Sequence, residues 1–69
     1  MKKYKVTVLG TLTEQTRISE INCDVIQLEG ESIVFKKKMM TSPKETWYMI
    51  VFIVPQNCSI VELLTIDIL

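Results

Sequence analysis

The fold of this chain is decided by eight consecutive apolar residues, Trp47-Tyr48-Met49-Ile50-Val51-Phe52-Ile53-Val54, which are followed by Pro55. A β-strand directs successive side chains to opposite faces, so a strand of this sequence is apolar on both faces. A chain of 69 residues buries only a small core of its own. The run therefore predicts a central strand that needs cover on both faces, and it favours self-association or a partner as the source of part of that cover.

This run contains two alternating sets of side chains. We expect one set to pack within the subunit and the other to meet a second layer that a partner supplies. Alternation alone does not decide which set packs inside the subunit and which meets the partner. We take the set that begins with Trp47 as the candidate oligomer interface. The first set is Trp47, Met49, Val51 and Ile53, and the second is Tyr48, Ile50, Phe52 and Val54.

A second stretch with alternating apolar residues, 21–28, changes phase near Asp24. A shift of one residue turns every following side chain to the other face, so we expect a bulge or a short break there. Gly30 lies in a polar turn between two segments rich in β-formers. Val25–Leu28 and Ser32–Lys36 therefore predict a hairpin.

The remaining segments also favour strands. Residues 4–8 alternate as a half-buried strand does, and residues 36–45 read as the longest loop. Over 60–68 the β-branched residues favour a strand, with a helix as the competing interpretation. The chain is thus expected to be all-β, with five to six strands in a small antiparallel meander. Either a small barrel, SH3-like or OB-like, or a sheet doubled against a partner chain would close it.

Composition restricts the class of protein. Apolar residues make up 48% of the chain, which argues against disorder, and eight basic residues balance eight acidic ones. Net charge therefore favours neither nucleic acid nor an anionic membrane. The basic segment 1–5 is not followed by an apolar segment, and eight apolar residues are far fewer than the ~20 of a membrane-spanning helix. We expect a single domain, 1–69, in the cytoplasm and away from membranes.

The sequence lacks the groups that catalysis most often uses. It has no histidine, the commonest general base and metal ligand, and its two glycines do not form a phosphate-binding loop. Cys23 and Cys58 lie 35 positions apart, whereas zinc sites use close cysteine pairs. We expect both thiols to be reduced and buried, and we expect neither enzymatic activity nor a cofactor or metal.

Charge is segregated along the chain. Residues 36–45 carry four lysines against one glutamate, whereas residues 14–31 carry five acidic residues against Arg17. Three interpretations stay open. The lysines solvate a loop and protect an edge strand, they pair with the acidic segment of another subunit, or they bind an anion such as a phosphate, a nucleotide or a nucleic-acid backbone. The candidate anion-binding residues are Lys36, Lys37, Lys38 and Lys44, with Tyr48 or Trp47 as a surface for stacking.

The order of features from Ile21 to Leu63 is strand, turn and strand over 21–35, then a variable loop, then Trp47–Val54 and Ile60–Leu63. This order resembles that of short all-β proteins carried by bacteriophages and other mobile elements. Some of those proteins are non-enzymatic inhibitors of host defence, and others are oligomers that sequester nucleotide signals. The resemblance implies a homo-oligomeric binding protein that acts on a host protein or on a small anionic ligand. A small-barrel nucleic-acid module and an accessory subunit of a larger assembly are the alternatives.

Overall fold

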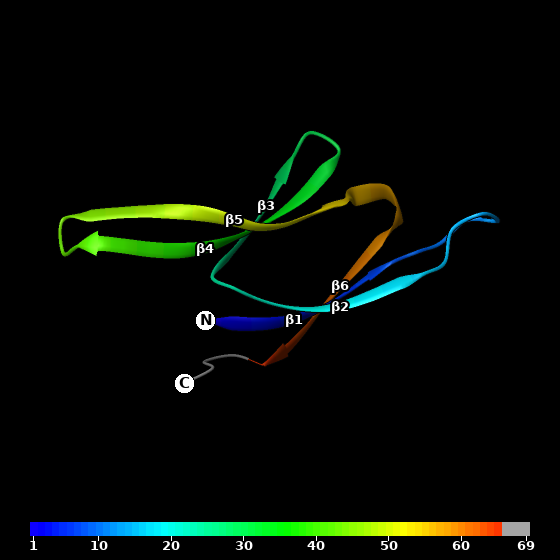
Figure 1. Cartoon of the computed structure of the whole chain (residues 1–69), viewed down its shortest axis with the longest axis horizontal. Helices are drawn as coiled ribbons and strands as arrows, with labels where there is room; N and C mark the ends of the chain where they lie inside the picture. The colour runs from blue at the N-terminus through cyan, green and yellow to red at the C-terminus, as the bar shows by residue number, and fades with distance from the viewer. Residues whose placement is uncertain (66–69) are drawn as a thin grey trace.

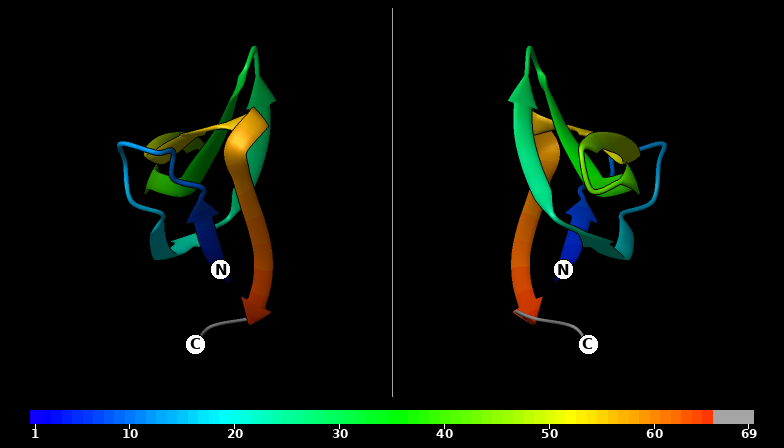
Figure 2. Two further views of the ribbon diagram at one scale, coloured as in Figure 1. Left: turned by 90° about the vertical axis from the view of Figure 1, so that its right-hand side faces the viewer. Right: turned by 90° about the vertical axis from the view of Figure 1, so that its left-hand side faces the viewer.

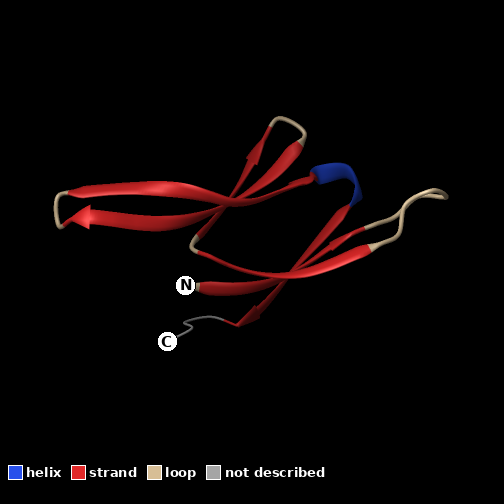
Figure 3. Cartoon of the chain, in the orientation of Figure 1, coloured by secondary structure: helices blue, strands red, loops and turns tan. Residues whose placement is uncertain are grey.

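The computed structural model describes residues 1–65 and shows six strands and one short 3-10 turn (Figure 1 and Figure 3). No α-helix is present in this part of the chain, so the all-β prediction is confirmed. None of its helical segments is long or apolar enough to span a membrane. The strands are β1 Lys2–Val8, β2 Arg17–Cys23, β3 Val25–Glu29, β4 Ser32–Ser42, β5 Glu45–Pro55 and β6 Ser59–Thr65.

The strands form two antiparallel sheets of three, in the orders β2-β1-β6 and β3-β4-β5. The chain passes from the first sheet to the second at Asp24, and it returns through the 3-10 turn Gln56–Cys58. The end-on views of Figure 2 show how narrow the molecule is, with extents of 48 × 26 × 14 Å.

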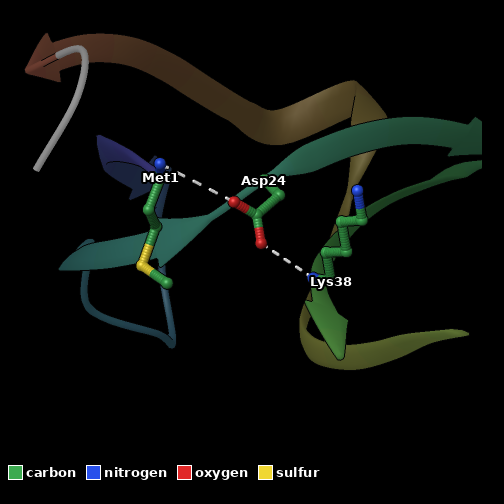
Figure 4. A network of polar contacts seen from close by, with 3 residues as sticks. All are labelled: Met1, Asp24 and Lys38. Atoms are coloured by element: carbon green, nitrogen blue, oxygen red, sulfur yellow. Dashed lines mark hydrogen bonds and ion pairs between the residues drawn. The ribbon is translucent and has the colours of Figure 1, made fainter. Parts of the chain in front are cut away.

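Asp24 makes the predicted break between β2 and β3. Its backbone amide donates to the Lys36 carbonyl at 2.9 Å, and its Oδ2 accepts a hydrogen bond from the Lys38 amide at 2.7 Å. The amino group of Met1 lies 3.7 Å from Asp24 Oδ1 (Figure 4). The Asp24 carboxylate therefore ties the link between the two sheets to strand β4 and to the start of β1.

A small core lies between the two sheets. It consists of the buried side chains of Val6, Cys23, Ile33, Phe35 and Val54. The ring of Phe35 is central, because its centroid lies 6.3 Å from that of Tyr4 and 5.9 Å from that of Phe52. Such pairs add to the stability that burial of the rings provides. Both sheets thus contribute to one core.

The hairpin predicted around Gly30 is confirmed. Residues 25–29 pair with residues 32–36, and Gly30 has a φ of +59°. This left-handed conformation strains a residue with a side chain and is readily adopted by glycine. The turn therefore sets the register of β3 against β4.

The prediction of a loop over residues 36–45 is wrong. Strand β4 continues to Ser42 and β5 begins at Glu45, so only Pro43 and Lys44 lie between the two strands. Lysines are compatible with a strand here because their side chains are half-buried or exposed and strand β5 supplies the ladder of hydrogen bonds.

Trp47–Val54 does form a strand, but its predicted central position is wrong. In this sheet β4 is the middle strand and β5 is an edge, because the next strand, β6, pairs with β1 in the other sheet. Residues 59–65 form strand β6, which excludes a helix over this range. The predicted continuation of that strand over 66–68 lies outside the described residues.

Candidate functional site

The two halves of the β4–β5 hairpin differ in their surroundings. The inner half packs on the core, and the outer half, which we call the arm, projects away from it (Figure 1). The arm comprises Lys36–Met40 of β4, Thr46–Ile50 of β5 and the turn between them. The chain has a radius of gyration of 13.6 Å, whereas a compact domain of this length has about 11 Å. The arm makes the molecule elongated.

A β-bulge at Val51 separates the two halves. Phe35 pairs with Phe52 and Lys36 pairs with Ile50, so Val51 has no partner on β4. An extra residue bends the strand and reverses the alternation of the side chains beyond it.

This bulge corrects the two predicted sets of side chains. Paired residues in adjacent strands share a face, and Phe52 and Val54 face the core. Beyond the bulge, Trp47 and Met49 continue that face. The opposite face carries Tyr48, Ile50 and Ile53. The predicted alternation therefore holds only in the inner half of the hairpin, where Phe52 and Val54 face the core and Ile53 faces away from it.

The apolar residues of β5 are open to solvent over most of its length. Val54 is 3% exposed, whereas Trp47, Tyr48, Ile50 and Ile53 are 45%, 50%, 52% and 55% exposed. The stretch carries no charge from Thr46 to Val54. Proteins commonly protect an edge strand with charges, and an apolar edge without them invites pairing with another strand. The arm is therefore a candidate surface for protein contact.

The structure does not gather the candidate anion-binding lysines into one cluster. Lys38 lies opposite Tyr48, so this lysine and this aromatic ring share one face of the arm. Lys36 lies on the same face, but its Nζ donates to Gln27 Oε1 and lies 3.8 Å from Glu29 Oε1. Lys37 lies on the other face, and Lys44 lies in the turn at the tip.

A hollow beside β5 is not evident from the sequence. Its volume is about 220 Å³, and it lies between the inner end of β5 and the ends of β1 and β2. The lining residues are Val8, Arg17, Ser19 and Phe52 to Pro55. These segments are far apart in the chain, and their proximity depends on how the two sheets pack, so no local pattern could have indicated the hollow.

The two cysteines are in different environments, and both are free. Cys23 is buried in the core as predicted, and its burial, followed by the neighbouring charge of Asp24, raises the pKa of its thiol. Cys58 is only half-buried, because it lies in the 3-10 turn at the end of the sheets. Within residues 1–65, no three side chains of the histidine, cysteine or carboxylate type are placed to hold a metal ion.

Three comparisons with known proteins leave the inference about function to this geometry. No family model matches the chain, and neither a curated protein nor a solved structure matches it.

Proposed function

We propose that this protein is a non-enzymatic binding protein that works as a homo-oligomer and makes its contacts through the arm. The observation that supports the proposal is the uncharged edge of β5, whose apolar side chains are exposed on both faces from Trp47 to Val51. Exposed apolar groups that lie next to one another are typical of surfaces that bind other proteins. Trp and Tyr are also the residues that most often anchor such interfaces.

The arm favours a protein contact over the binding of a small anion. An anion site needs several cations that converge, and the arm divides its lysines between two faces and a turn. Lys36 is already paired with Glu29. The resemblance to phage-type inhibitors and sequestering proteins agrees with a role in which the protein occupies a target in the cytoplasm without chemical turnover.

Native mass spectrometry of protein purified from cells tests this proposal, because it reports the subunit number and any retained molecule together. We expect more than one copy in the wild type. The double substitution Trp47→Ser and Met49→Ser should yield monomers, because it removes two neighbouring apolar groups from one face of the arm. Leu12→Ser is the control, because Leu12 is fully exposed in the loop between β1 and β2. A wild type that stays a compact monomer from nanomolar to micromolar concentration would contradict the proposal.

A small-barrel nucleic-acid module is the second candidate, and the pair formed by Lys38 and Tyr48 favours it. A cation beside an exposed aromatic ring can contact a phosphate while a base stacks on the ring. Binding of a single-stranded oligonucleotide should then weaken steeply as salt rises, and Lys38→Gln should reduce that salt dependence. Equal binding by Lys38→Gln and wild type would exclude this function. A different protein retained in equal amount in the native mass spectrum would instead indicate an accessory subunit.

A further inference from the structure

We infer that β5 pairs with β5 of a second copy of this chain, antiparallel and about a two-fold axis at Ile50. The pairing would join the two β3-β4-β5 sheets into one six-stranded sheet. This inference rests on the proposed self-association and specifies the surface that carries it.

Strand β5 is the least protected edge of the molecule. Within residues 1–65, the four edge strands are β2, β3, β5 and β6. Each of the other three edge strands is at most seven residues long and carries at least one charged residue. Strand β5 has eleven residues and a single charge, Glu45, at its start. Charges on an edge oppose pairing with another strand, so β5 is the edge most open to it.

The sequence of β5 is suited to pairing with itself. The uncharged stretch Thr46–Val54 is centred on Ile50. With Ile50 at the axis of an antiparallel pair, the stretch from Trp47 to Val54 lies opposite its own copy. Because Val51 bulges out of the ladder, Met49 pairs with Phe52 of the second copy, and Thr46 lies opposite Pro55. Proline has no amide to donate, so the ladder ends there without an unpaired donor. An isologous contact of this kind closes at two subunits.

The same register places the arm of each copy along the body of the other. Trp47 lies opposite the second copy's Val54, beside the hollow of about 220 Å³ that Phe52–Pro55 help to line. An aromatic side chain that fills a hollow at an edge is a common anchor of protein interfaces. Each arm would thus cover apolar surface that the other chain leaves exposed.

Charge is complementary at the two ends of the pairing. Lys44 would lie beside the second copy's Gln56, whose amide donates to the Glu31 carbonyl at 2.8 Å in its own chain. Lys44 and Glu31 are both exposed, and extended side chains at these positions can reach one another. The two-fold axis makes this contact twice, so Lys44 of one copy meets Glu31 of the other at each end.

The exposed area agrees with one missing contact of this size. The chain exposes 5275 Å², whereas a compact monomer of its mass exposes roughly 4,500 Å². The excess is close to the ~800 Å² that one partner buries in an interface of standard size.

Sedimentation velocity from nanomolar to high micromolar concentration tests the interface on the full chain. We expect a monomer–dimer equilibrium in the wild type. Ile50→Lys places two like charges at the axis and should raise the dimer dissociation constant roughly thirty-fold or more. Leu12→Lys makes the same change on an exposed residue away from β5 and should leave the constant unchanged. Circular dichroism verifies that each variant folds.

Two further variants test the register. Lys44→Glu should weaken the dimer a few-fold, and addition of Glu31→Lys should restore it, because the swap re-creates two opposite-charge contacts. In a Cys58→Ser background, Ile50→Cys should form a disulfide-linked dimer on mild oxidation, because residues at the axis have Cβ atoms about 5 Å apart. Leu12→Cys, equally accessible, should not.

The outcomes distinguish this interface from self-association in general. A wild-type oligomer that Ile50→Lys leaves intact, or a cross-linked ladder of higher species, would overturn the two-fold pairing of β5 and leave the proposed self-association standing. A wild type that is monomeric at every concentration would overturn both and would leave the edge of β5 to a different partner.

Discussion

The body and the arm are built from the same two strands, yet only the body is packed. In the inner half of the hairpin Phe35 and Val54 are buried in the core, whereas every residue of β5 from Glu45 to Val51 is exposed. The sequence of β5 is equally apolar in both halves. What differs is the opposing layer, because the sheet β2-β1-β6 lies over the inner half. An apolar strand is therefore not by itself a core strand, and the difference separates stability, which lies in the body, from binding, which we place in the arm.

The largest expected effect separates the two regions by the same kind of truncation. Phe35→Ala should destabilise the fold by about 3–5 kcal/mol, because it opens a cavity where three aromatic rings meet. A core of this size contributes only about 3–5 kcal/mol in total, so we expect this variant to be unfolded. Trp47→Ala removes a ring of similar size from the arm, and the monomer should keep its stability within about 0.5 kcal/mol.

Urea unfolding followed by circular dichroism measures both variants. The measurements belong in the Ile50→Lys background, because dimerisation would add its own free energy to the apparent stability. Equal destabilisation by Phe35→Ala and Trp47→Ala would contradict the division between body and arm.

A smaller effect is expected where the arm joins the body. Asp24→Ala removes the acceptor of the Lys38 amide and the partner of the Met1 amino group, and it should cost about 1–2 kcal/mol. Asp24→Asn keeps an acceptor for the amide and loses the charge, so its cost should be about half. Hydrogen exchange of the Lys38 amide is the direct readout, and its protection should fall in the alanine variant and persist in the asparagine variant. Unchanged protection in the alanine variant would show that Asp24 does not hold the base of the arm.

The sequence predicts the strands of the body well and the arm poorly, for physical reasons. Alternation and a glycine turn are local features, so the break at Asp24 and the hairpin at Gly30 are both recovered. At the bulge at Val51 the pairing of β4 with β5 shifts by one residue, and no residue type in the sequence marks this point. The edge position of β5 depends on where β6 pairs, which is decided by long-range packing. The spread of the lysines over two faces follows from that same ladder.

The smallest effect concerns the cysteines, which report on the body and its rim. Because Cys23 is buried in the core and Cys58 is half-buried in the 3-10 turn, a thiol reagent should label Cys58 first, and Cys23 only as fast as the body opens. Burial raises the folded-state pKa of the Cys23 thiol above its ordinary value of 9.0, so the folded state holds the proton more tightly than the unfolded chain does. The associated stability is present below pH 9.0 and declines as the pH rises above it, because only the unfolded chain then releases the proton.

Unfolding measurements on either side of pH 9.0 test this, with Cys23→Ala as the matched control. The variant is less stable at every pH because it leaves a small cavity, but it should lack this part of the alkaline decline. Phe35→Ala would raise the labelling rate of Cys23 to that of Cys58, since it unfolds the body, whereas Trp47→Ala would leave the two rates apart. If Cys23 were labelled as fast as Cys58 in the wild type, the body would not protect its own core, and the contrast between a packed body and an exposed arm would fail.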